Sequence, residues 1–240
     1  MLVGMDVPAA RPRSRRSYLE LLRARWLLLA ALGTAGIGVF VKLTSELTEG
    51  ELDPIDRAIL AQIIALRTPS INGISVDLTA LGSVTVLTLI VSIAVCLFAL
   101  NRHWGSVSQL LIAVLGGAVG STLLKRVLER ERPPELGRLV HVASFSYPSG
   151  HSLSSASIYL TLAILAARRM PNPTAQKLIV VFAIVLATTV GMSRAYIGVH
   201  YPSDIAAGLA LGGGWALLVS AFFSYLRGRG TLPEARVPYD

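Results

Sequence analysis

The 240-residue chain has few charged side chains and only one cysteine. Asp, Glu, Lys and Arg make up 15% of its residues, whereas a soluble domain of this length carries about a quarter. The single cysteine, Cys96, excludes an intrachain disulfide bond and a metal site built from several cysteines. Apolar residues make up 53% of the chain and the mean hydropathy is +0.61. This composition favours a membrane protein over a soluble one.

The basic residues are unevenly distributed along the chain, which has a formal net charge of +8. Six arginines precede the first apolar run, and other basic residues lie in the short gaps between apolar runs. This distribution is typical of a membrane topology signal rather than of a face that binds nucleic acid. We therefore expect membrane lipids, and no nucleic acid, among the partners of the protein.

Six uncharged runs predict six transmembrane helices. They comprise residues 26–41, 78–101, 104–124, 152–167, 178–193 and 205–226. A helix needs about 20 apolar residues to cross about 30 Å of hydrocarbon. Three runs have this length, and the shorter three end beside Lys or Arg side chains that can reach the interface. The predicted fold class is therefore all-α and polytopic: a six-helix domain over 26–226, a basic N-terminal segment 1–25 and a C-terminal tail 227–240.

Residues 54–67 are too short and too charged to span the membrane. Their apolar residues Ile55, Ile59, Ile63 and Leu66 fall near one helical face. We expect a short helix that lies flat at the membrane interface between the first two spans.

Two glycine pairs spaced four residues apart lie inside predicted spans. They are Gly116 with Gly120, and Gly208 with Gly212. Small residues at this spacing share a helical face, so both pairs predict close contact with a neighbouring helix.

The short loops predict the orientation of the spans. With six spans, four basic segments fall on the same side of the membrane: the N-terminal segment, Arg102, residues 168–177 and residues 227–229. That side, which also holds both termini, is therefore expected to be cytoplasmic. The first loop on the other side is acidic, but the second contains Lys125, Arg126, Arg130, Arg132 and Arg138. These cations break the rule, so some of them are expected to serve chemistry. Arg126, Arg130 and Arg138 could contact a substrate head group, but we favour contacts with solvent or with lipid phosphates, and their roles stay open.

Three polar clusters fall on this same, non-cytoplasmic side. They are KRVLERERP at 125–133, PSGH at 148–151 and SRAYIGVHYPSD at 193–204. Lys125, Arg132 and Arg194 supply cations suited to phosphate oxygens. Backbone N–H groups of Ser149 and Gly150, at the start of a helix, can point toward an anion.

Two histidines complete the set of groups that phosphoryl transfer requires. One neutral imidazole can attack phosphorus, while the other donates a proton to the departing oxygen. Pro202 suits the first position of a helix, which places Asp204 in the first turn near His200. An aspartate there can fix the tautomer of the imidazole.

The three segments, read as K-x6-RP, PSGH and SR-x5-H-x3-D, resemble the signature of the type 2 phosphatidic acid phosphatase (PAP2) superfamily. Every signature position is matched, and the resemblance covers residues 26–226. It implies that His200 is a nucleophile forming a phosphohistidine, that His151 protonates the leaving group and that Asp204 orients His200. It further implies that the phosphate is held, without metal or cofactor, by Lys125, Arg132, Ser149, Gly150 and Arg194.

The resemblance implies a lipid phosphatase of a bacterial cell membrane whose active site faces the extracytoplasmic side. The implied reaction is hydrolysis of a phosphomonoester or a terminal pyrophosphate, on lipids such as phosphatidic acid, phosphatidylglycerol phosphate or undecaprenyl pyrophosphate. A phosphotransferase that uses the same phosphohistidine is an alternative, as is a transporter or lipid-binding protein with a degenerate site. The natural lipid and the oligomeric state stay open.

Overall fold

The computed structural model describes residues 15–232, with all their side chains except those of 15–23 and Leu136. This range forms eight α-helices and one 3-10 helix and contains no strand, so the predicted all-α fold is confirmed. The elements are α1 (Arg15–Thr48), α2 (Leu52–Ala65), α3 (Pro69–Ala80), α4 (Val84–Leu100), α5 (Trp104–Leu128), η1 (Glu135–Gly137), α6 (Gly150–Ala167), α7 (Pro173–Tyr196) and α8 (Pro202–Gly228). Arg11 and Arg13 of the basic N-terminal segment lie outside the described residues, as do residues 233–240 of the predicted tail.

Five of the described helices are long and apolar enough to cross a membrane: α1, α5, α6, α7 and α8. The sixth predicted span, 78–101, is not one straight helix, because α3 and α4 meet at a bend of 43°. Ser83 caps α4 by accepting a hydrogen bond from Val86 N–H at 3.3 Å. A side chain at Gly82 would overlap Val190 of α7 and come within 3.0 Å of Ser155 Oγ. The chain therefore breaks where its backbone presses against α6 and α7.

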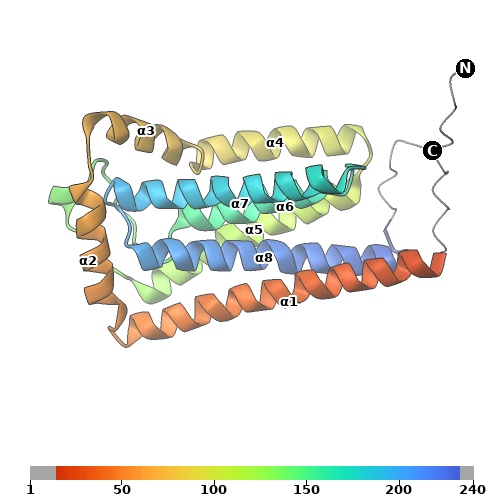
Figure 1. Cartoon of the computed structure of the whole chain (residues 1–240), viewed down its shortest axis with the longest axis horizontal. Helices are drawn as coiled ribbons and strands as arrows, with labels where there is room; N and C mark the ends of the chain where they lie inside the picture. The colour runs from red at the N-terminus through yellow and green to blue at the C-terminus, as the bar shows by residue number, and fades with distance from the viewer. Residues whose placement is uncertain (1–14, 233–240) are drawn as a thin grey trace, which may run out of the picture.

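Helix α2 lies across one end of the bundle, as the sequence predicts for residues 54–67 (Figure 1). Ile55, Ile59 and Leu66 are exposed, while Asp56 and Leu60 face the bundle and are buried. Beyond α2, Arg67 donates hydrogen bonds to Tyr196 O at 2.8 Å and Gly137 O at 2.7 Å. These bonds fix the corner between α2 and α3 to the end of α7.

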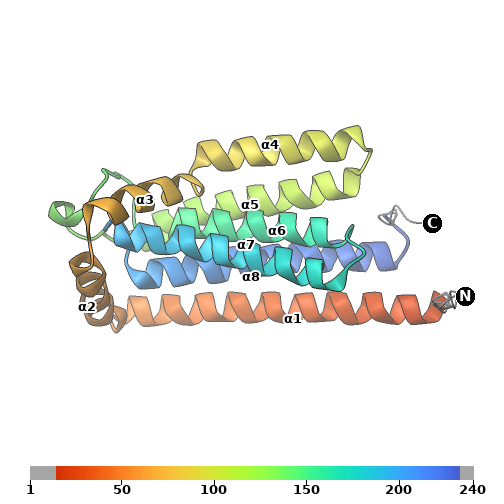
Figure 2. The same cartoon turned by 45° about the horizontal axis from the view of Figure 1, so that its top comes forward.

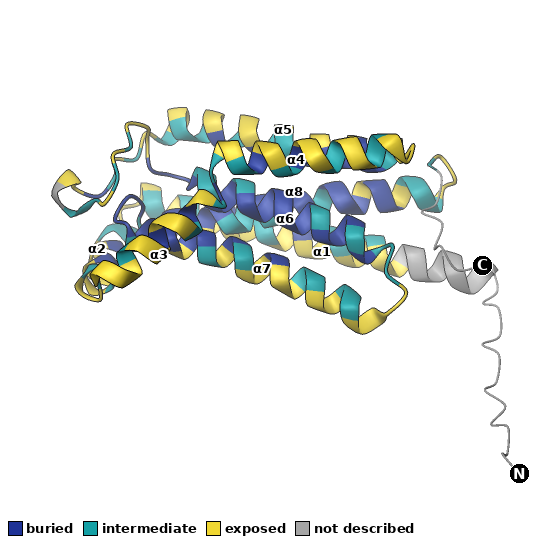
Figure 3. Cartoon of the chain, turned by 90° about the horizontal axis from the view of Figure 1, so that it is seen from above, coloured by how far each residue is buried: buried dark blue, intermediate teal, exposed yellow. Residues whose placement is uncertain are grey.

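Helix α6 occupies the centre of the bundle, and the other long helices surround it (Figures 2 and 3). In the most apolar window of each helix, 72% of the residues of α6 are buried but only 11% of those of α1. Helix α6 packs against α5, α7 and α8, and α1 packs along α8. Outer helices turn apolar side chains such as Leu89, Leu115 and Phe182 outward, as expected of helices in contact with lipid.

Glycines allow α8 to approach α6 closely. A side chain at Gly208 would come within 2.6 Å of Ser149 O, and one at Gly212 would overlap the backbone of Leu153. The predicted contact of this pair is confirmed. The prediction for the other pair is confirmed only for Gly116, which lies against the ring of Trp215. A side chain at Gly120 would meet no atom within 4 Å.

We expect Gly212→Ala to destabilise the protein, because the added methyl group would force the backbones of α6 and α8 apart. Overpacking of this kind costs about 1–3 kcal/mol. The matched control is Gly213→Ala, whose added methyl group would meet no atom within 4 Å. Thermal unfolding of both variants in detergent should show a lowered melting temperature for Gly212→Ala alone. Equal melting temperatures would contradict this account of the α6–α8 contact.

Candidate active site

The predicted site residues come from four helices but gather at the end of the bundle that α2 covers. Lys125 lies in the last turn of α5, Gly150 begins α6, Arg194 lies in the last turn of α7, and α8 begins just after His200. Because α5 to α8 alternate in direction, the loops 129–149 and 197–201 meet at this end (Figure 1).

His200 and Asp204 form a buried pair at the start of α8. Their exposed fractions are 1% and 0%, and His200 Nδ1 lies 3.3 Å from Asp204 Oδ2. Pro202 opens α8, as predicted, so that Asp204 lies in the first turn. There Asp204 accepts hydrogen bonds from Tyr201 N–H at 2.8 Å and from Ser146 Oγ. These contacts hold the carboxylate in place against the imidazole.

The contacts of His200 identify its tautomer. Arg132 Nη1 lies 3.1 Å from His200 Nε2. An arginine can only donate, so Nε2 must accept this hydrogen bond and the ring proton lies on Nδ1, facing Asp204. Burial lowers the pKa of His200 to about 3, although the hydrogen bond to Asp204 opposes this shift. The ring is therefore neutral near pH 7, and Nε2 is unprotonated with its lone pair directed at Arg132.

Three cations around the histidines are held by neutral oxygen atoms. Lys125 Nζ donates to Phe145 O at 2.6 Å and to Ser146 O at 3.1 Å. Arg132 donates to Val199 O at 2.6 Å, and Arg194 Nη1 donates to Thr79 Oγ1 at 3.1 Å.

The buried Nε of Arg194 has no partner among the described residues, and within residues 15–232 no carboxylate forms an ion pair with any of the three. Burial lowers the pKa of Arg132 to about 10, which still leaves it charged at neutral pH. The positive charge of this pocket is thus available to an anion.

His151 lies in the first turn of the central helix α6, beside the bend between α3 and α4. A side chain placed on Gly82 would come within 3.1 Å of His151 Cδ2. Lys125 Cε lies 3.9 Å from the position that a side chain at the neighbouring Gly150 would take. The start of α6 with His151 and the start of α8, where His200 contacts Arg132, therefore both lie beside cations.

Ser149 differs in part from the sequence prediction. Its side chain caps α6 by accepting a hydrogen bond from Ser152 N–H at 3.4 Å. Its own N–H donates to Asp204 O at 3.0 Å, so it cannot also point at an anion. The amides of Gly150 and His151 lie in the first turn of the helix, where N–H groups lack intrahelical acceptors. These two amides, rather than that of Ser149, are suited to an anion.

Arg130 is not solvated, and the expectation that it contacts solvent or lipid phosphate is wrong. Its side chain is 8% exposed and donates to Asp204 Oδ1 at 2.7 Å, to Asp56 Oδ2 at 2.7 Å and to Asp53 Oδ1 at 3.0 Å. Burial alone would lower the pKa of Arg130, but Asp204 and Asp56 outweigh it and raise the pKa. The carboxylates come from α2 and α8, far from Arg130 in sequence, so the loop pattern could not reveal them.

The other two cations of the loop have different surroundings. Arg126 is exposed, in agreement with the prediction. Arg138 is largely covered, with 12% of its side chain exposed, and donates to Pro133 O at 2.7 Å. The expectation of solvent contact therefore holds only in part for Arg138, which lines the cavity beside the site but is also bonded to its own loop. His141 is exposed and lies 3.6 Å from Glu135.

Sequence reasoning missed Ser146, Asp56 and Ser203, which support the His200–Asp204 pair. Ser203 N–H donates to Asp56 Oδ1 at 2.9 Å, and its hydroxyl donates to Asp56 Oδ2. Asp56 could have been noticed, because it shares the inward face of an amphipathic helix with Leu60, four residues later. Neither serine has a comparable signal in the sequence.

A cavity of about 780 Å³ opens beside the site, between α2 and the loop after α5. Arg132 and Tyr201 line it on the side of the histidines, and Arg57, Leu60 and Ile64 line it from α2. Its walls combine charged and apolar groups, as a pocket for an amphipathic molecule would. Within the described part of the chain, no group of three or more His, Cys, Asp or Glu side chains could hold a metal ion.

The chain has five helices that are long and apolar enough to cross a membrane, or six with the bent pair, and the relatives that it matches are phosphatases, so it is an integral membrane phosphatase. The PAP2 superfamily matches residues 106–227, and the chain is a member of that superfamily. It is 33% identical over 175 residues to phosphatidylglycerophosphatase B of Bacillus subtilis (strain 168), covering 72% of this chain and 85% of that protein.

Two further comparisons agree with this assignment. The crystal structure of a transmembrane PAP2 type phosphatidylglycerolphosphate phosphatase from Bacillus subtilis matches with a TM-score of 0.74 and 29% identity, over 79% of this chain and 94% of that chain. Lipid A 1-phosphatase of Rhizobium etli is 33% identical over 135 residues, which cover 52% of this chain and 53% of that protein.

We expect Asp56→Asn to destabilise the protein strongly, because it leaves the buried Arg130 short of a counter-charge. Removing one partner of a buried ion pair costs about 3–5 kcal/mol. Asp53→Asn is the matched control, because Asp53 pairs with the same guanidinium group but its own side chain is 49% exposed. Exposed pairs contribute about 0–1 kcal/mol. Thermal unfolding in detergent should rank wild type and Asp53→Asn close together, with Asp56→Asn well below; the reverse order would refute this reading of the network.

Proposed function

We propose that this protein hydrolyses the terminal phosphate of a membrane lipid through a phosphohistidine on His200. The observation that carries the proposal is the geometry of His200. Its Nδ1 faces Asp204, and its unprotonated Nε2 points at Arg132, in a pocket of cations that have neutral partners.

The reaction would proceed in two displacements at phosphorus. In the first, the Nε2 lone pair attacks phosphorus, the N–P bond forms as the P–O bond to the lipid breaks, and His151 protonates the departing oxygen. In the second, water attacks the phosphohistidine while His151 accepts a proton from it. The N–P bond then breaks, phosphate leaves and both histidines return to their initial states. Asp204 stabilises the charge that develops on the His200 ring.

Lys125, Arg132 and Arg194 would hold the non-bridging oxygens of the phosphate, together with the Gly150 amide. Ser149 would act by capping α6, which positions that amide and His151. An entering phosphate would take over the Arg132 hydrogen bond now made to Nε2, and so release the nucleophile at the moment when substrate arrives.

A lipid substrate fits a site at the end of a membrane bundle, where headgroups lie. Relatives with named activities include phosphatidylglycerophosphatase B and lipid A 1-phosphatase. Phosphatidylglycerol phosphate is the first candidate, because the first of these relatives matches the larger share of this chain. Phosphatidic acid and undecaprenyl pyrophosphate are the other members of the proposed class.

The function is tested by phosphate release from these three lipids by the purified protein in EDTA. We expect release from at least one of them, and full activity in chelator, because the cations already neutralise the phosphate. Vanadate, which can adopt a pentacoordinate geometry like that of phosphorus in the transition state, should inhibit. Activity that is lost in EDTA and restored by Mg²⁺ would contradict the proposed chemistry.

The two histidines should fail differently when each is replaced by alanine. His200→Ala removes the nucleophile and should abolish activity on every substrate. His151→Ala removes the general acid, whose help is worth about 10²–10⁴-fold in rate. A good leaving group such as p-nitrophenolate needs little protonation, so His151→Ala should lose far less activity on p-nitrophenyl phosphate than on a lipid phosphate.

Rates of both variants on both substrates provide the measurement, with folding checked by size-exclusion chromatography in detergent. Asp204→Asn should resemble a weakened His200→Ala defect, since the carboxylate orients the ring. The roles must be exchanged if His200→Ala retains activity on the activated ester while His151→Ala has none.

We further propose that the site faces the extracytoplasmic side and that both termini are cytoplasmic, on the basis of the basic loops at the opposite end. In a Cys96→Ala background, cysteine replaces either the exposed His141 beside the site or the exposed Asn172 at the far end. An impermeant thiol reagent on intact cells should label position 141 and not position 172. The reverse labelling would invert the orientation.

A further inference from the structure

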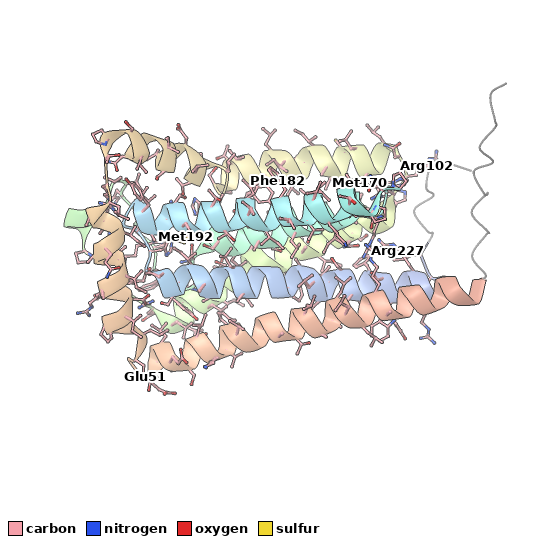
Figure 4. The ribbon with its side chains drawn as sticks, viewed as in Figure 1. Glu51, Arg102, Met170, Phe182, Met192 and Arg227 are labelled. Carbon is pink, nitrogen blue, oxygen red and sulfur yellow. The ribbon has the colours of Figure 1, made fainter. Side chains whose placement is uncertain are left out.

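The two ends of the bundle differ in charge. All ten acidic residues with described side chains belong to the half that carries the site: Glu46, Glu49, Glu51, Asp53, Asp56, Asp77, Glu129, Glu131, Glu135 and Asp204. Figure 4 shows Glu51 at that end and Arg102, Met170 and Arg227 at the other. Within the described residues, Arg168, Arg169 and Arg227 at the far end form no ion pair with a carboxylate.

Three arginines converge at this far end and form what we term the distal arginine cluster: Arg168 and Arg169, which directly follow α6, and Arg227 in the last turn of α8. Arg168 donates to Gln109 Oε1 at 3.1 Å and to Ser224 Oγ at 2.6 Å. Arg227 donates to the same oxygen of Gln109 at 3.2 Å. Two guanidinium groups thus share one neutral amide oxygen.

Arg169, the third member of the cluster, donates to Ser106 Oγ at 3.0 Å and lies over the ring of Phe98, 5.0 Å from its centroid. Arg227 likewise lies 6.0 Å from the ring centroid of Phe223. The face of each ring favours the guanidinium charge beside it but does not neutralise that charge.

The positive charge of the distal arginine cluster is not neutralised by the described protein. Burial lowers the pKa of Arg168, and the nearby positive charges of Arg227, Arg25 and Arg169 lower it further. Arg227 Nη1 is buried and has no hydrogen-bond partner in the described structure. Buried charges need a counter-charge, because transfer of an unpaired ion out of water is costly.

We propose that the distal arginine cluster binds the phosphate of an anionic phospholipid in the leaflet opposite the active site. Guanidinium groups match phosphate oxygens in bidentate geometry, and basic pockets between helices on the cytoplasmic side are suited to anionic headgroups. The lipid phosphate would supply the missing negative charge and satisfy Arg227 Nη1. The site is separate from the proposed chemistry, since it lies at the other end of the bundle.

The proposal is tested by titrating the detergent-purified, full-length protein with dioleoyl phosphatidylglycerol, with dioleoyl phosphatidylcholine and with inorganic phosphate, following the melting temperature. Phosphatidylglycerol alone should stabilise wild type. Arg227→Gln should weaken the apparent affinity about fivefold or more. Lys177→Gln is the matched control, because it removes one exposed positive charge from the same end of the molecule. Its affinity should stay near that of wild type.

Each other outcome counts against the proposal. Equal affinity of Arg227→Gln and Lys177→Gln would show that the arginines only tie helices together. If inorganic phosphate raised the melting temperature as much as phosphatidylglycerol does, the ligand of the cluster would be a free anion and not a lipid. If Arg227→Gln does not fold, Arg169→Gln takes its place and should give the same loss. All these variants keep the catalytic end unchanged, so lipid bound there contributes equally to every curve.

Discussion

One guanidinium group, that of Arg130, joins the elements at the end of the molecule that carries the candidate site. It lies between the buried carboxylates of Asp204 and Asp56, with Asp53 at its outer edge. Neither buried carboxylate could remain ionised away from water without a counter-charge. Arg130 lies in the loop after α5 and binds carboxylates from both α2 and α8, so it joins these three parts of the chain. The same contact helps to orient Asp204 beside His200.

The cations of the site therefore fall into two kinds with different physical roles. Arg130 is neutralised by carboxylates, and its charge is used within the protein. Lys125, Arg132 and Arg194 are held by carbonyl and hydroxyl oxygens, which fix their positions without cancelling their charge. Such a pocket attracts an anion and is preorganised for it, which is the arrangement that stabilises charge developing in a transition state.

The distal arginine cluster repeats the second kind of arrangement at the other end of the bundle. There too, neutral partners such as Gln109 and Ser224 position guanidinium groups and leave their charge in place. The central helix α6 connects the two regions, since His151 stands in its first turn and Arg168 follows its last residue. The glycines of α8 let this helix pack closely against α8.

The sequence by itself determined the all-α membrane class, the interfacial helix and the candidate residues from Lys125 to Asp204. Those features are local: apolar runs have a length, Pro202 begins a helix, and motif residues occur at short spacings. Only the tertiary structure decided that Arg130 neutralises Asp204 and Asp56, that Ser149 N–H is already bonded, and that the chain bends at Gly82. Each of these features depends on groups from separate parts of the chain. A buried charge or hydrogen-bonding group is satisfied by the partner that packing brings near, and the spacing of residues along the sequence does not specify that partner.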